Sequence, residues 1–221
     1  MASWQVEPTR ASARWLAYRQ TSPEWPPLYH AAGEPYPTQE AGRWHRLGGG
    51  YCQYFSLTPA GAWAECVRYL SIRSRERARE QRRNLWVALV DERQVADLST
   101  FEKYDECGLD PRIAVGPHGS SERLADELRD AGFRGVLSPS AALPGAINLS
   151  IFGERYEHVT VGDLSSWRNP DPGCWVPVQA VAEMTGPPAE LTLETCFLNA
   201  PHYGYREWLA DRGRPLPADP P

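Results

Sequence analysis

The sequence predicts an α+β fold, in which short strands and a few helices follow one another without regular alternation. Runs rich in aromatic and β-branched residues, such as residues 51–57 and 85–90, indicate strands, and they stand at uneven distances from the helical patterns. The 18 glycines and 21 prolines among 221 residues indicate many loops and short elements rather than a helical bundle. Because strand and helix do not alternate regularly, a doubly wound sheet is not expected.

The first quarter of the chain predicts two strands separated by a long loop. Residues 15–19 (WLAYR) have the apolar character of a short strand, whereas residues 1–13 are polar and resemble a loose arm. Several prolines in residues 23–37 disfavour regular structure, so this stretch is predicted to be a loop. Residues 51–57 (YCQYFSL) follow three consecutive glycines and are predicted to form an aromatic strand.

A helix is predicted directly after this second strand. Thr58 can cap the helix with its hydroxyl, and Pro59 suits the first helical position. Glu65 falls in the second turn of this helix, among small and apolar neighbours. The apolar positions that recur at helical spacing are Ala62, Cys66, Val67 and Leu70.

The remaining elements are spaced less evenly. Residues 73–83 form a charged run in which Glu76 and Glu80 stand three or four positions from arginines, the pattern of a solvated helix with ion pairs. An amphipathic helix is predicted from Ser120 onwards, and Gly132 is its expected stop. Further strands are predicted at residues 85–90, 95–98, 135–137 and 146–152.

Composition argues against several classes of function. The net charge of −5 gives no general attraction for nucleic acid, so direct nucleic-acid binding is not expected, although the arginine run keeps it as an alternative. The cysteines form no CxxC pair and the histidines no HExxH motif, so we expect neither a zinc ribbon nor metal catalysis. Neither of the common Gly-rich nucleotide motifs occurs. Without an apolar signal region or a run of membrane-spanning length, a cytoplasmic protein with no membrane contact is expected.

Four polar residues, three of them at loops or strand ends and one within a strand, are candidates for a binding site. Arg43 lies on a glycine-flanked loop, where a guanidinium can approach a phosphate and bind it with two hydrogen bonds, and Arg19 follows the first strand. Tyr54 could stack on a flat ring such as nicotinamide, although a tyrosine within a strand more often belongs to the core. Ser140 could bind a phosphate or an amide, or could cap a turn.

Glu65 is the most informative single residue of the sequence. A carboxylate among small and apolar residues is costly to bury unless it has a partner or a chemical task. Placement on the polar edge of an amphipathic helix is an equally good explanation on local grounds. As a functional group, a carboxylate beneath a ribose could accept hydrogen bonds from its hydroxyls and stabilise an oxocarbenium-like transition state.

Five segments, in this order, resemble the RES-domain family. The resemblance covers residues 15–153, which we expect to be the catalytic domain. Around it we expect an N-terminal arm (1–14), a C-terminal extension packed on the domain (154–210) and a disordered tail (211–221). No single segment is specific, but the ordered series is. The segments are YRQTSP at 18–23, GRW at 42–44, YFSLTPAGAWAE at 54–65, AGFRGVL at 131–137, and PSA at 139–141 with NLSIF at 148–152.

The resemblance implies an ADP-ribosyltransferase-like fold, with small mixed β-sheets that form a cleft flanked by helices. It also implies an enzyme of the glycosyltransferase class that degrades NAD by phosphorolysis or hydrolysis of the nicotinamide–ribose bond. Such proteins are commonly toxins that an Xre-type antitoxin neutralises. NAD is then a substrate and inorganic phosphate a candidate co-substrate, with no tightly bound cofactor and no metal. The implied catalytic residues are Glu65, Arg43 and Tyr54, and the implied NAD-binding residues are Arg19, Arg43, Tyr54, Ser140 and Asn148.

Two alternatives to NAD degradation remain open at this point. The same residues could serve a protein ADP-ribosyltransferase, which differs only in the acceptor. A RES-like fold could also have lost catalysis and act as a nucleotide-binding or interaction module. A homo-oligomer is a further partner that the sequence permits. Residues 154–221 lack a counterpart in compact RES toxins and could bind an antitoxin, cover the cleft or specify an acceptor.

Overall fold

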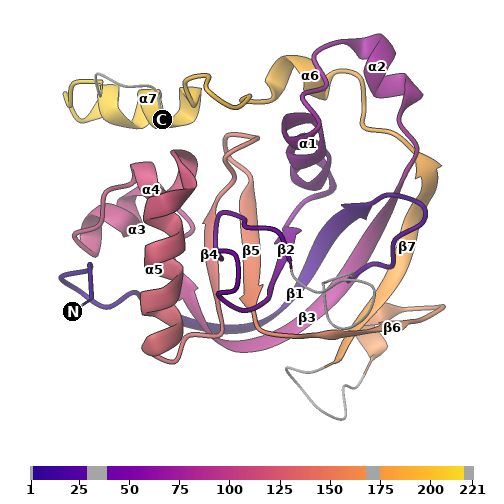
Figure 1. Cartoon of the computed structure of the whole chain (residues 1–221), viewed down its shortest axis with the longest axis horizontal. Coiled ribbons are helices and arrows are strands. Elements are labelled where there is room, and N and C mark those ends of the chain that lie inside the picture. The colour runs from indigo at the N-terminus through magenta and orange to yellow at the C-terminus, as the bar shows by residue number, and fades with distance from the viewer. Residues whose placement is uncertain (1, 29–38, 168–174, 217–221) are drawn as a thin grey trace.

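The computed structural model describes residues 2–28, 39–167 and 175–216, and its centre is one mixed β-sheet (Figure 1). Within these residues, seven strands are hydrogen-bonded in the order β1-β2-β5-β4-β3-β7-β6. Because β1 also pairs with β3, the first five strands of this order close into a barrel. The strands are β1 (Arg10–Thr21), β2 (Cys52–Ser56), β3 (Arg83–Asp97), β4 (Gly135–Pro139), β5 (Ile147–Phe152), β6 (Tyr156–Val159) and β7 (Trp175–Thr185).

The length of β3 decides this architecture. With 15 residues, β3 is long enough to pair with β1, β4 and β7 at different positions along its course. The ladders β3–β4 and β6–β7 are parallel, and the others are antiparallel. The prediction of mixed strands and helices is confirmed, but the expectation of several small sheets is wrong. A single strand shared by three partners makes the sheet continuous, and closure leaves the barrel strands without a free edge.

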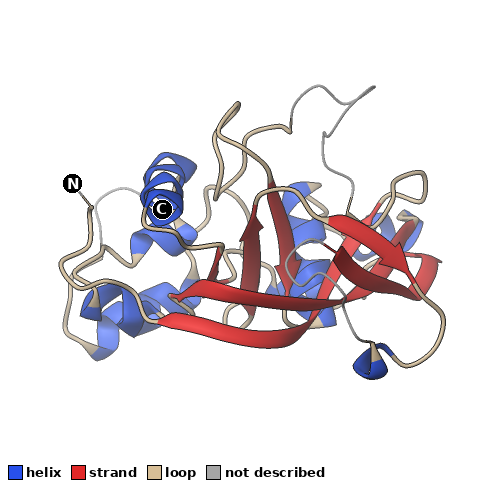
Figure 2. Cartoon of the chain, turned by 90° about the horizontal axis from the view of Figure 1, so that it is seen from below, coloured by secondary structure: helices blue, strands red, loops and turns tan. Residues whose placement is uncertain are grey.

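The helices lie on two sides of the β4–β5 hairpin (Figures 1 and 2). In Figure 1, α3, α4 and α5 gather beside β4, whereas α1, α2 and α6 lie beyond the other side of the hairpin. None of the helices in the described ranges is long and apolar enough to cross a membrane. They are α1 (Pro59–Tyr69), α2 (Arg75–Glu80), α3 (Phe101–Glu106), α4 (Arg112–Val115), α5 (His118–Asp130), α6 (Leu191–Glu194) and α7 (Tyr203–Asp211), with a 3-10 turn at Leu164–Ser166.

Helix α1 begins as the sequence predicts. Thr58 has an extended backbone, and its Oγ1 accepts a hydrogen bond from the N–H of Gly61 at 3.0 Å, while Pro59 occupies the first turn. The predicted stop of α5 is also confirmed, because Gly132 follows the helix with a φ of +83°. Cap chemistry thus fixes one end of each of these two helices.

Several elements differ from the prediction. Strand β1 begins at Arg10 rather than at residue 15, since its polar first residues pair with the far end of β3. The two strands predicted between residues 85 and 98 are one strand, which bends at Gln94 through a φ of +60°. Helices α3, α4, α6 and α7 and strands β6 and β7 were not predicted. The predicted loop at 23–37 lies partly outside the described residues.

The charged run at 73–83 is helical only over α2. Gln81 adopts an extended backbone that ends the helix, and the chain then enters β3. Among the described residues, neither Glu76 nor Glu80 forms an ion pair, so the prediction that ion pairs stabilise this helix is wrong. Within α2 the i, i+4 spacing joins like charges, Arg75 with Arg79 and Glu76 with Glu80, so this spacing offers no favourable ion pair.

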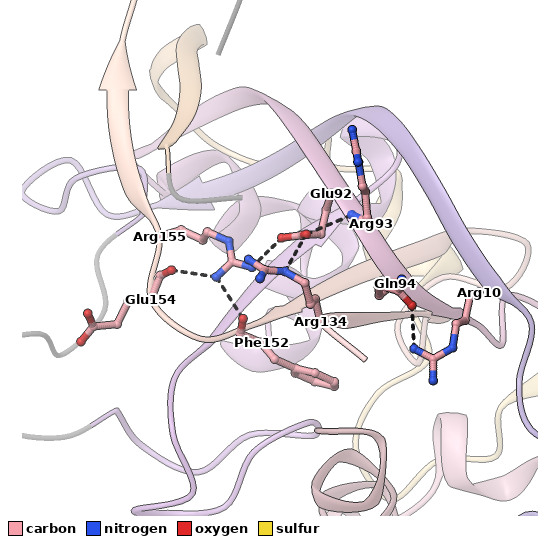
Figure 3. A network of polar contacts seen from close by, with 8 residues as sticks. All are labelled: Arg10, Glu92, Arg93, Gln94, Arg134, Phe152, Glu154 and Arg155. Carbon is pink, nitrogen blue, oxygen red and sulfur yellow. Dashed lines mark hydrogen bonds and ion pairs between the residues drawn. The ribbon is translucent and has the colours of Figure 1, made fainter. Parts of the chain in front are cut away.

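An ion network around a buried carboxylate connects the barrel to the C-terminal extension (Figure 3). Glu92 on β3 is 4% exposed; its Oε1 accepts from Arg134 Nε at 2.8 Å and its Oε2 from Arg155 Nη2 at 2.6 Å. Nη1 of Arg155 donates to the carbonyl oxygens of Phe152 and Glu154 at 3.0 and 2.7 Å. The network therefore joins β3, the residue before β4 and the connection from β5 to β6.

Candidate active site

The centre of the site is the carboxylate of Glu65 on α1. Its Oε1 accepts two hydrogen bonds, from Ser140 Oγ at 2.7 Å and from Asn148 Nδ2 at 2.6 Å. Within the described part of the chain, Oε2 has no hydrogen-bond partner. The carboxylate is therefore fixed through one oxygen, and the other remains available to a ligand.

Ser140 follows β4 at the tip of the β4–β5 hairpin and is fully buried. While its Oγ donates to Glu65, it accepts from the N–H groups of Ala142 and Leu143, each at 3.1 Å. Its own N–H donates to the carbonyl of Ala146 at 2.8 Å and closes the hairpin. Every hydrogen-bonding group of this side chain is thus engaged, which fixes the hydroxyl in one orientation.

Asn148 stands on β5, opposite Ser138 of β4 and Ser56 of β2. The barrel ladder thereby places an amide donor beneath the carboxylate. Its Oδ1 is buried and has no hydrogen-bond partner among the described residues, whereas its Nδ2 is committed to Glu65. The pairing of β2, β5 and β4 is what brings Asn148, Ser140 and Glu65 together.

Arg43 sits on a tight loop that Tyr54 holds in place. The phenol oxygen of Tyr54 accepts from the N–H of Trp44 at 2.9 Å and lies 2.8 Å from His45 Nδ1. Burial raises the pKa of Tyr54, so the phenol stays neutral and can donate to that imidazole nitrogen. A Cβ at Gly42 would come within 2.7 Å of the Tyr54 oxygen, which explains why glycine precedes the arginine.

The guanidinium of Arg43 is anchored at one end. Its Nη1 donates to the carbonyl oxygens of Gly116 and Ile113 at 2.8 and 3.3 Å. Burial lowers the pKa of Arg43, and the negative charge of Glu65 opposes this shift. The arginine and the carboxylate therefore act on each other electrostatically, although no hydrogen bond joins them. A guanidinium that is anchored through one nitrogen can bind a phosphate through its remaining nitrogens.

Arg19 lies on β1, and its Nη1 donates to Oε1 of Gln53 on β2. Gln53 is fully buried, and its Nε2 donates to the carbonyl of Leu28 at 3.3 Å. The hydrogen bonds given for the described residues join Arg19 to Gln53, and those given for Glu65 join it to Ser140 and Asn148. The structure thus gathers Glu65, Ser140 and Asn148 directly, places Arg43 within electrostatic reach, and sets Arg19 on the neighbouring strand.

Two residues of the site were missed by the sequence analysis. Arg68 is buried on α1, three positions after Glu65, and donates from Nη1 to the carbonyl of Cys196. Burial lowers its pKa, and the charge of Glu65 opposes that shift. The i, i+3 spacing on a predicted helix could have revealed it. His202 donates to the carbonyl of Ser140, which lies 62 residues earlier in the sequence. No local sequence pattern predicts this contact.

The carboxylate and the arginines of this site define the chemistry that it can perform. One fixed carboxylate can accept hydroxyl hydrogen bonds and stabilise a developing positive charge, and arginine forks nearby can hold phosphates. In the described ranges, no group of three His, Cys, Asp or Glu side chains is placed to hold a metal ion. The four cysteines that are described, Cys52, Cys66, Cys107 and Cys196, are buried and free.

The barrel and this site define a mixed α/β protein in which a fixed carboxylate lies within electrostatic reach of arginines. The chain belongs to the RES domain family, whose sequence pattern matches residues 13–170. The resemblance seen in the sequence is thereby confirmed. The roles of the individual site residues stay predictions.

Two proteins illustrate what the chain is similar to. Over 136 residues it is 31% identical to a probable NAD(+) phosphorylase of Mycobacterium tuberculosis. That match covers 62% of this chain and 65% of the relative, so it spans less than two thirds of the relative's length. The fold is similar to a chain in the crystal structure of the M. tuberculosis MbcT–MbcA toxin–antitoxin complex. The TM-score is 0.56 at 17% identity, over 84% of this chain and 91% of that one.

Proposed function

We propose that this protein is an NAD-degrading enzyme that cleaves the bond between nicotinamide and ribose, with water or inorganic phosphate as the acceptor. The observation that carries this proposal is the one-sided anchoring of Glu65. Ser140 and Asn148 occupy Oε1, and Oε2 lacks a hydrogen-bond partner among the described residues. A carboxylate held in this way can accept a ribose hydroxyl through Oε2 without reorganising.

The cleavage itself makes modest demands on the protein. When the glycosidic bond breaks, its electron pair goes to the nicotinamide nitrogen, which leaves as a neutral group without needing a proton. The positive charge passes to the ribose carbon, where a nearby carboxylate stabilises it more strongly in a half-buried site than in water. Attack by water at that carbon yields ADP-ribose, and attack by phosphate yields ADP-ribose 1″-phosphate.

The other candidate residues have supporting roles in this proposal. Arg43 and Arg19 bind the two phosphates of NAD through their guanidinium forks. The hydroxyl of Tyr54 is committed to the arginine loop and its ring packs partly against the core, so the proposal assigns only the remaining part of the ring to contact with nicotinamide or its ribose. Ser140 and Asn148 hold Glu65, and Asn148 retains a buried acceptor at the site.

The similar proteins support the biological setting of the proposal. A relative with the name NAD(+) phosphorylase favours NAD as the substrate, and a fold shared with a toxin–antitoxin complex favours a toxin role. We include an Xre-type antitoxin as the partner, the cytoplasm as the place of action and no tightly bound cofactor. Assignment to the glycosyltransferase class and to an ADP-ribosyltransferase-like fold belongs to the same proposal.

Incubation of the purified protein with NAD, with and without inorganic phosphate, tests the proposal when the products are resolved by mass. We expect nicotinamide release by the wild type and a loss on the order of 10²–10³-fold in Glu65→Gln, because the charge that stabilises the cation is gone. Glu80→Gln, on the exposed face of α2, is the matched control and should keep full activity. A folded, partner-free wild type that releases no nicotinamide would overturn the proposal. Attachment of ADP-ribose to protein would identify a protein acceptor instead.

A further inference from the structure

A segment of the C-terminal region crosses the tip of the β4–β5 hairpin, as Figure 1 shows. This strap, residues 195–202, connects α6 to α7. The N–H of Cys196 donates to the carbonyl of Ala142 at 2.8 Å, and the carbonyl of Cys196 accepts from Arg68. Since Arg68 lies one turn after Glu65, the strap joins the helix of the carboxylate to the hairpin of Ser140.

His202 ends the strap and is 3% exposed. Its Nδ1 accepts from the N–H of Tyr205 at 3.0 Å and thereby caps α7. Burial lowers the pKa of His202 to about 4, so the ring is neutral at physiological pH. A neutral imidazole that accepts at Nδ1 carries its proton on Nε2, and that atom lies 3.1 Å from the carbonyl oxygen of Ser140. His202 is therefore both a helix cap and a donor to the active-site hairpin.

The start of α7 also packs tightly on the hairpin. A Cβ at Gly204 would lie 3.0 Å from the Cβ of Pro144, which is closer than most side-chain contacts. The strap and α7 lie beyond residues 13–170, the part of the chain that matches the family. Contacts to α1 and to the hairpin from outside this range indicate that the site is not complete within it.

We propose that His202 is a positioning residue, which fixes the backbone of Ser140. Because the hydroxyl of Ser140 holds the carboxylate of Glu65, His202 also fixes that carboxylate. The C-terminal strap thus completes the active site. The hydroxyl of Ser140 makes three hydrogen bonds at once, and their geometry depends on where its backbone lies. Displacement of a positioned group by about 1 Å can cost on the order of 10²-fold in rate. The catalytic part of this inference rests on the proposed function, whereas the structural part does not.

Two substitutions test separately the two roles of His202, the N-cap of α7 and the hydrogen-bond donor to Ser140. His202→Asn keeps a side-chain oxygen that can cap α7, but its side chain is too short to reach the carbonyl of Ser140. His202→Gln can present a donor at the position of Nε2 and loses the cap. Arg206→Ala, exposed one turn further along α7, is the matched control. The measurements are kcat and KM for nicotinamide release, thermal melting, and hydrogen exchange at the amides of Ala142 and Leu143.

The outcomes distinguish positioning from simple stability. We expect His202→Asn to lose about tenfold or more in kcat with little change in KM, to exchange both hairpin amides faster, and to melt about 2–4 °C lower because the buried carbonyl of Ser140 loses its donor. His202→Gln should recover most of kcat while its Tm falls by about 2–4 °C. Wild-type kcat and wild-type exchange in His202→Asn would refute the positioning role. If the wild type releases no nicotinamide, the proposed function fails, and the exchange rates still decide whether His202 holds the hairpin.

Discussion

Replacement of Ser140 by alanine measures how far the site depends on one hydroxyl. The change removes the donor 2.7 Å from Glu65 Oε1 and the acceptor 3.1 Å from the N–H groups of Ala142 and Leu143. A hydrogen bond to a charged group contributes about 1.5–3 kcal/mol, so kcat/KM should fall by about 10- to 10²-fold. Loss of the acceptor for two amides in a buried turn costs at least about 1 kcal/mol, and the Tm should fall by about 2–4 °C.

Ser150 provides the matched control for this experiment. It is fully buried on β5, two residues beyond Asn148, but its hydroxyl has no hydrogen-bond partner among the described residues. Ser150→Ala therefore removes no hydrogen bond, and the variant should be as stable as the wild type or more stable. The assay is the initial rate of nicotinamide release over a range of NAD concentrations, together with thermal melting. Equal kcat/KM in Ser140→Ala and Ser150→Ala would refute the reasoning.

Three further predictions concern the fold, the pH response and the arginine loop. Glu92→Ala leaves the buried guanidinium of Arg155 without its counter-charge and should lower the free energy of unfolding by about 3–5 kcal/mol in urea titrations. At low temperature the folded fraction should keep its NAD turnover, and a specific loss of turnover would contradict this. The lowered pKa of His202, about 4 instead of 6.5, means that the unfolded chain binds this proton more readily than the folded one. Its contribution to stability is therefore full above pH 6.5 and lost as the pH falls towards 4, so the Tm of the wild type should drop more steeply over that window than the Tm of His202→Asn. Gly42→Ala places a Cβ 2.7 Å from the Tyr54 oxygen and should raise KM for NAD, whereas Gly119→Ala, where nothing lies within 4 Å, should not.

Local chemistry made part of the fold predictable. The cap at Thr58 with Pro59, the aromatic run of residues 51–57 and the glycine stop at 132 depend only on near neighbours in the chain. The ordered segments of the sequence likewise identified the RES domain family. Such features are read correctly because a cap or a turn is satisfied within a few residues.

The approach of the site residues to one another could not be predicted in the same way. Glu65 meets Ser140 and Asn148 only because β2 pairs with β5 and β5 pairs with β4, and such ladders join residues far apart in the chain. The missed strand β7 has an exposed, mixed second half that resembles a loop until β3 supplies its partner.

The sequence by itself provided the main candidates for chemistry, because a carboxylate among apolar neighbours and an arginine after a loop glycine are local facts. Only the tertiary structure decided which of them act together. Closure of the barrel through β1 and β3, and the strap that brings His202 to Ser140, are contacts over long sequence separations. Their free energy comes from hydrogen bonds and burial that exist only after the chain has folded, so no window of neighbouring residues contains it.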